Sequence, residues 1–176
     1  MTFITRLALL LLIAAPAQAQ HTHGNHGSAD VTETGQAQFA SIAEIVTVIR
    51  DDPSTDWARV DIQALRDHLV DMDNVTTRSM VAVEEADASV IFTITGDAEV
   101  AQSIQNMVTA HTPMLAAETG WSVASALVAD GAMMTITVSD DEQRHQVLGL
   151  GFYGVMTIGA HHQQHHLMIA KGDDPH

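Results

Sequence analysis

Cysteine does not occur anywhere in this sequence of 176 residues. A chain without cysteine forms no disulfide and offers no thiolate to a metal, which excludes cysteine-ligated clusters and thiolate zinc sites. Its stability must come from a buried core, and any metal ion must be held by imidazole, thioether or carboxylate groups.

Basic residues are also scarce. Lysine and arginine together number 7, against 22 aspartate and glutamate residues, and the formal net charge is −15 at pH 7. Such a charge repels nucleic acid and anionic lipid and attracts cations. We therefore expect no nucleic-acid partner. The same acidity is equally well explained as a means of keeping the protein soluble.

Long apolar runs are limited to the N-terminus. Residues 1–19 contain one basic residue, Arg6, followed by an apolar run at 7–15 and a small-residue pattern that ends at Ala19. This arrangement is typical of a secretory signal peptide cleaved near Ala19. We expect a periplasmic or secreted protein, and no later run reaches the length of a membrane span.

The rest of the chain divides by composition into three parts. Residues 20–35 are polar and are predicted to form a flexible arm, residues 36–172 a single α+β domain, and residues 173–176 a tail. The arm could collect metal ions at low affinity or could be a solvated leader without a role. It carries three histidines: His21, His23 and His26.

Apolar periodicity predicts that the folded part repeats a helix-strand-strand unit at an offset of about 43 residues. A further helix is expected at each end, and Pro113 is expected to kink or break the helix that contains it just after His111. This order predicts a two-layer α+β fold, a four-stranded antiparallel sheet with helices on one face. The expected helices are 36–50, 57–75, 97–117 and 139–170, and the expected strands 79–85, 89–95, 121–128 and 132–138.

A block of histidines near the C-terminus is the strongest functional signal. His161, His162, His165 and His166 form two i,i+4 pairs if this segment is helical. The Cβ atoms of a pair would lie about 5–6 Å apart, so both imidazoles could bind one ion. Adjacent histidines point about 100° apart on a helix. One pair with ligands from elsewhere is therefore a better site than all four together.

The outside ligands are expected on the two repeat helices. The 43-residue offset places His68 on His111, beside the apolar stripe of each helix. A single histidine in such a place is usually buried and bonded to a carbonyl. Two histidines at matching positions of a repeat instead suggest that the two side chains approach each other. Glu118 and the arm histidines are further candidates. The predicted metal ligands are His161, His162, His165, His166, His111, His68, His21, His23 and His26.

The available ligand types favour copper. Imidazole suits copper, zinc, nickel and iron, whereas thioether favours Cu(I). Methionines stand at helical spacing from the histidines, Met72 from His68 and Met107 and Met114 from His111, although methionine at such positions commonly fills a core. Zinc, nickel or haem are alternatives to copper.

Four glycines fall within the expected last helix, and each costs about 1 kcal/mol relative to alanine. Close approach of a neighbouring element would explain them most simply. Room for a bulky ligand, such as non-covalently bound haem, is the alternative. They are Gly149, Gly151, Gly154 and Gly159.

Together these features predict an exported metal-binding protein that buffers, transports or delivers an ion, with copper favoured, and that passes it to a metal-delivery partner protein. The sequence contains no His-Glu-x-x-His and no nucleophile motif, which favours binding over catalysis. The alternatives are a metalloenzyme with an open histidine-ligated position, a haem-binding protein, and an interaction module without a cofactor.

Overall fold

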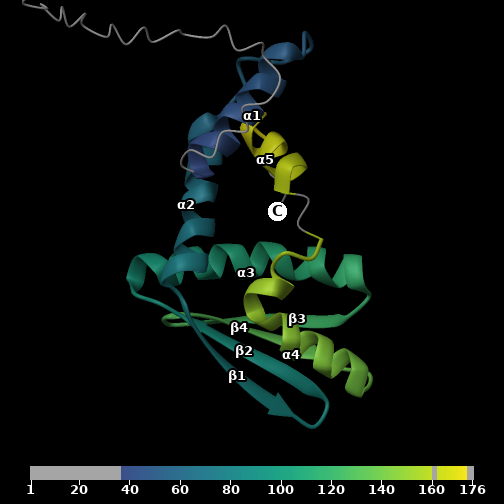
Figure 1. Ribbon diagram of the computed structural model, residues 1–176. Coiled ribbons are helices and arrows are strands. Elements are labelled where there is room, and N and C mark those ends of the chain that lie inside the picture. The colour runs from purple at the N-terminus through teal and green to yellow at the C-terminus, as the bar shows by residue number, and fades with distance from the viewer. Residues whose placement is uncertain (1–36, 160–161, 174–176) are drawn as a thin grey trace, which may run out of the picture. The chain divides into compact units, whose positions relative to one another are not determined.

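The computed structural model describes residues 37–159 and 162–173 (Figure 1). The predicted signal peptide, the arm with its three histidines, and His161 lie outside this part of the chain. The described elements are α1 (Ala37–Asp51), α2 (Ile62–Arg78), β1 (Met80–Ala86), β2 (Ser89–Thr95), α3 (Ala98–Thr119), β3 (Ser122–Val128), β4 (Gly131–Thr137), α4 (Asp141–Val155) and α5 (His162–Ala170).

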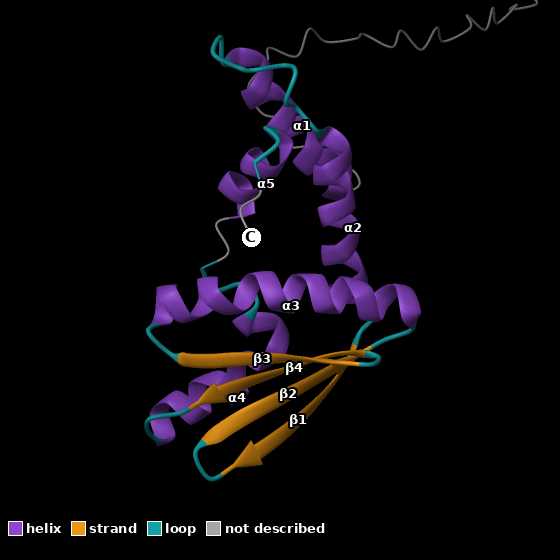
Figure 2. Cartoon of the chain, turned by 180° about the vertical axis from the view of Figure 1, so that it is seen from behind, coloured by secondary structure: helices purple, strands orange, loops and turns teal. Residues whose placement is uncertain are grey.

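The four strands form one antiparallel sheet in the order β1-β2-β4-β3 (Figure 2). Phe92 on β2 lies opposite Val83 on β1 and Met134 on β4. Directly opposed residues share a face of a sheet, and every second residue of β2 is buried, so one face forms the core. The predicted mixed α+β fold with an antiparallel sheet is confirmed.

Helices α3 and α4 cover the core face of the sheet. The rings of Phe92 on β2 and Phe152 on α4 have centres 6.3 Å apart, and Ile104 and Val108 on α3 are fully buried in the same cluster. The helices α1, α2 and α5 instead pack on one another around a smaller core. That core consists of Ile45, Ile49, Leu65, Leu69, Ile169 and Ala170.

An aspartate begins each of three helices. The carboxylates of Asp61, Asp97 and Asp140 accept hydrogen bonds from backbone N–H groups three residues later, at the starts of α2, α3 and α4. Such N-caps satisfy donors that the helix itself leaves unpaired. The cap at Asp61 places the start of α2 at Ile62, several residues later than predicted.

Pro113 does not break α3, which continues to Thr119 and ends at Gly120 in the left-handed conformation. Proline at this position removes the N–H that would bond to the carbonyl of Thr109. Thr109 is exposed, so water can satisfy that carbonyl. The helix therefore tolerates the proline near its end.

The prediction of one unbroken helix over 139–170 is wrong. α4 ends at Val155 and α5 begins at His162. Gly151 has φ 60° and ψ −177°, and Gly159 has φ 71°, values that only glycine adopts readily. Gly151 kinks α4 internally, and Gly159 redirects the chain between α4 and α5.

The predicted repeat offset also needs correction. β1 begins at Met80 and β3 at Ser122, an interval of 42 residues, while α2 has 17 residues and α3 has 22. His68 lies two turns after the cap of α2, but His111 lies four turns after the cap of α3. The two histidines are therefore not at equivalent positions of their helices.

Candidate metal site

Five histidines from three helices gather in one region. The ring centre of His68 lies 4.8 Å from that of His165 and 5.4 Å from that of His166, so α2 and α5 face each other here. The rings of His162 and His166 have centres 6.0 Å apart. The five are His68 on α2, His111 on α3, and His162, His165 and His166 on α5.

The ring separations are close to those of imidazoles that share an ion. Histidine nitrogen binds copper or zinc at about 2.0–2.1 Å, and the ring centre lies about 1 Å beyond it, so two rings on a tetrahedral ion have centres about 5 Å apart. The ring of His68 lies near this distance from the rings of His165 and His166, whereas the rings of His165 and His166 are 6.4 Å apart, wider than a tetrahedral ion requires. We call these three the imidazole group.

The rings are not yet oriented around a common point. The ring plane of His68 is inclined at 52° to that of His165 and at 68° to that of His166. Within residues 37–159 and 162–173, no set of three or more histidine or acidic side chains already has the geometry of a metal site. Rotation of the imidazoles about their side-chain torsions must precede binding by all three.

His166 is buried without a hydrogen-bond partner. Its side chain is 4% exposed, and neither ring nitrogen has a partner among the described residues. A buried polar group left unpaired costs about 1–3 kcal/mol. Burial, reinforced by the charge of His162, lowers the pKa of His166, so the ring is neutral at pH 7. Neutral imidazole is the form that binds metal ions.

His111 is buried as well. The ring, 5% exposed, lies near the backbone of Val155 and Ile158, while Nε2 is buried without a partner among the described residues. Burial lowers the pKa of His111 and the backbone of Val155 opposes this. A ligating histidine is commonly oriented by a backbone contact at its other ring nitrogen.

A cavity of about 30 Å³ lies among these side chains. This is close to the share of liquid volume of one water molecule, so an ion would fit. None of the described residues around the cavity is acidic, and three are methionines. The lining consists of His68, Met107, Ala110, His111, Met114, Met156, His162 and His165.

The structure separates the predicted methionine partners. Met107 and Met114 line the cavity, whereas Met72 packs against the small core of α1, α2 and α5. Met156 lines the cavity and was not predicted. The sequence signal was weak, because Met156 reaches the site only after α4 ends, and the expected unbroken helix would have carried it elsewhere.

Among the four glycines, only Gly159 combines a glycine conformation with close approach to another element. A Cβ atom there would lie 3.0 Å from Cβ of Glu118 and 3.2 Å from the carbonyl oxygen of Met114. By contrast, nothing lies near a Cβ built on Gly149 or Gly151. The connection to α5 therefore runs directly against the end of α3, beside Glu118.

The C-terminal end of α5 is anchored to the loop between α1 and α2. The backbone N–H of Asp61 donates to the carbonyl of Ala170 at 2.9 Å, and Arg59 contacts Asp173 at 2.6 Å. Lys171 pairs with Asp52 at 2.8 Å and holds the pKa of that carboxyl well below its usual range. These contacts position the helix that carries three of the five histidines.

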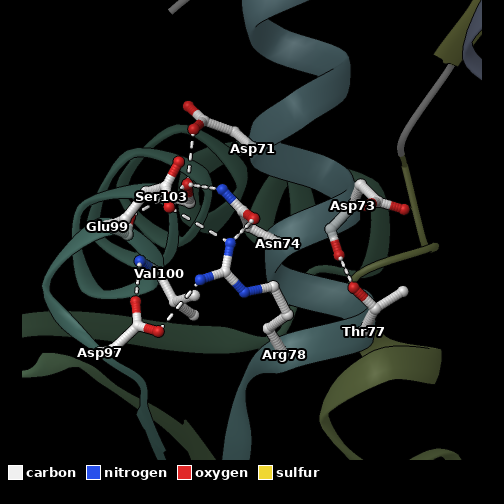
Figure 3. A network of polar contacts seen from close by, with 9 residues as sticks. All are labelled: Asp71, Asp73, Asn74, Thr77, Arg78, Asp97, Glu99, Val100 and Ser103. Atoms are coloured by element: carbon white, nitrogen blue, oxygen red, sulfur yellow. Dashed lines mark hydrogen bonds and ion pairs between the residues drawn. The ribbon is translucent and has the colours of Figure 1, made fainter.

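A polar network fixes α2 on α3 (Figure 3). The buried Asn74 amide donates to the hydroxyl of Ser103 at 3.0 Å, and Ser103 donates to Asp71 at 2.7 Å. Arg78 donates to Asn74 at 2.9 Å and to Asp97, the N-cap of α3, at 3.0 Å. The network sets the position of α2, and with it that of His68 relative to α3.

Comparisons of the chain with protein-family models, with curated proteins and with solved structures found no match. Across the helices that the structure describes, none combines the length and apolar character needed to cross a membrane. Function is therefore argued from the chemistry of the site.

Proposed function

We propose that this chain is an exported metal-binding protein that buffers, transports or delivers a transition-metal ion, with copper favoured over zinc and nickel. The main support is His166, whose two buried nitrogens have no partner among the described residues and whose ring lies among three other imidazoles. A bound ion would supply the missing partner. Export rests on the signal-peptide pattern of residues 1–19.

The size of the cavity favours an ion over haem. Pockets for organic ligands typically occupy about 300–1,000 Å³, whereas the cavity among the histidines holds about 30 Å³. A wider groove beside His68 is lined by Asp67, Asp71 and Asp173. These carboxylates would repel the propionates of a haem placed there.

Copper is favoured because imidazole and thioether groups surround the same cavity. Met107, Met114 and Met156 stand among the histidines, and thioethers bind copper better than zinc or nickel. The cavity itself has room for an ion but not for an organic substrate, and the sequence contains no nucleophile motif. Storage or transfer of the ion therefore fits the geometry better than catalysis on an organic molecule.

The test is native mass spectrometry of untagged protein with copper, zinc and nickel in competition. We expect at least one tightly bound ion per chain, with copper preferred. His166→Gln should weaken binding of divalent copper or zinc by about tenfold or more, equivalent to at least about 1.4 kcal/mol. His145→Gln, which changes an exposed histidine on α4, is the matched control and should bind like the unmodified chain. Retention of no ion after loading and dialysis would refute the proposal.

A further inference from the structure

We propose that the cavity is itself a softer metal site, formed by the thioethers of Met107, Met114 and Met156 and by Nε2 of His111, and that it is separate from the imidazole group, whose His166 does not line it. The site would take a monovalent soft ion, Cu(I), for which Ag(I) is the probe. This inference rests on the proposed metal-binding function and assigns a distinct subsite within it. We call these four side chains the thioether group.

All members of the thioether group line one cavity. Met107 and Met114 lie four residues before and three residues after His111, so the three side chains share one face of α3. Met156 comes from the turn after α4, where its backbone N–H donates to the carbonyl of Phe152 at 3.0 Å. Two separate segments therefore place sulfur and nitrogen around the same space.

The unpaired Nε2 of His111 points to a ligand. The ring packs near the backbone of Val155 and Ile158, at the end of α4 and in the turn that follows it. Nε2 itself is buried, without a partner among the described residues, in a side chain only 5% exposed that lines the cavity. A metal ion is the partner that suits this lone pair and the neighbouring sulfur atoms.

The neutral lining of the cavity favours a monovalent ion over a divalent one. None of the described lining residues is acidic, so the ligands are neutral. The free-energy penalty for moving an ion out of water grows with the square of its charge, so a divalent ion pays about four times as much as a monovalent one. Thioether sulfur also binds Cu(I) and Ag(I) better than borderline ions such as Zn(II).

Core packing alone does not explain the thioether group. Met107 and Met156 do pack against the sheet core, as methionines often do. Leucine would fill the same space, however. Packing therefore does not explain why sulfur atoms stand beside the unpaired Nε2 of His111. Substitution of methionine by leucine separates the two explanations, because it keeps the volume and removes the sulfur.

The thioether group and the imidazole group are different in composition. The imidazole group joins α2 to α5, and the thioether group joins α3 to the turn after α4. His162 lines the cavity of the thioether group, and its ring centre lies 6.0 Å from that of His166, so it stands close to both groups. We expect one borderline ion at the imidazole group and one soft ion at the thioether group.

The experiment compares Zn(II) and Ag(I) binding by native mass spectrometry and competition titration of untagged protein. The Met114→Leu/Met156→Leu double variant should lose Ag(I) affinity by about tenfold or more and keep Zn(II) affinity within about twofold. His166→Gln should lose Zn(II) affinity by about tenfold or more and keep Ag(I) affinity within about twofold. Met133→Leu, on the other face of the sheet, is the control. Cu(I) titration without oxygen should follow Ag(I).

X-ray absorption of the Ag(I)-loaded protein should show sulfur neighbours. Unchanged Ag(I) affinity in the folded double variant, or a silver ion with nitrogen neighbours alone, would overturn this inference and leave the imidazole group standing. Failure of the unmodified protein to bind any of these ions would instead refute the proposed function as a whole. Circular dichroism of each variant excludes misfolding as the cause of a lost site.

Discussion

The ring of His166 is buried between α2 and α5 with neither nitrogen paired among the described residues. An unpaired buried group destabilises the metal-free fold, whereas an apolar side chain of similar shape would not. His166, the main support for metal binding, therefore lowers the stability of the metal-free protein. Such a conflict between stability and local chemistry is expected at functional sites.

His166→Leu should stabilise the metal-free protein and impair metal binding in the same molecule. We expect the free energy of unfolding without metal to rise by about 1–2 kcal/mol, because the desolvation penalty of the ring disappears. Urea denaturation in the presence of a chelator measures this change. His145→Leu, at an exposed position, should leave stability nearly unchanged. A less stable apo His166→Leu protein would contradict the destabilising effect assigned to the unpaired ring.

At the scale of elements, α5 owes its placement to its two ends. Its C-terminal end is held by the bond from Asp61 to Ala170 and by the pair of Lys171 with Asp52. Its N-terminal end follows Gly159, which runs against Glu118 on α3. The histidines on α5 thus meet those on α2 and α3 because both ends are fixed.

Gly159→Ala should disturb the site through the N-terminal end of α5. A Cβ at φ 71° is strained and would crowd Glu118, so the free energy of unfolding should fall by about 1–3 kcal/mol. Metal affinity should fall as well, because His162 would move away from the cavity. Thermal denaturation and metal titration measure the two effects.

Gly149→Ala is the matched control for that variant. A Cβ there meets open space on a helix, so alanine should raise stability by up to about 1 kcal/mol. Equal responses of the two variants would contradict the role assigned to Gly159.

The sequence predicted those elements whose signals are local. The strand propensity of residues 90–95 marks β2, and Asp140 marks the start of α4. The break before α5 was missed, because a glycine that permits close packing and a glycine with positive φ look the same in a sequence. Met156 was missed for the same reason.

The gathering of the candidate ligands was predictable only in part. The i,i+4 spacing of His162 and His166 indicated a shared direction on one helix. The approach of His68 depends on how α2 lies on α3, which the network of Asn74, Ser103 and Arg78 determines. No local pattern encodes that angle. His68 and His111 were paired by an offset that the strands do not follow.

At the scale of the whole molecule, the buried histidines should make the stability of the metal-free protein depend on pH. Burial lowers the pKa of His111 and His166 in the folded state, whereas each titrates near 6.5 in the unfolded chain. The unfolded state therefore binds more protons once the pH falls below about 6.5. Stability should be full above that pH and should decline toward the folded-state pKa, by at most about 1.4 kcal/mol per pH unit for each group.

Urea denaturation between pH 8 and pH 5, with a chelator present, tests this dependence. Carboxylates such as Asp97, whose pKa is also lowered, act at more acidic pH and do not confuse the result. The decline should be smaller in His166→Leu. A flat profile across this range would contradict burial of neutral imidazoles.

The candidate ligands come from α2, α3 and α5, which are far apart in the sequence and meet only in the folded chain. An unfolded chain in transit across a membrane has at most the local pairs of the C-terminal block to offer, with no cavity around them. Under the proposed function, a newly exported molecule would cross empty and acquire high affinity only when its helices have assembled. Only molecules that have completed folding after export would then bind the ion.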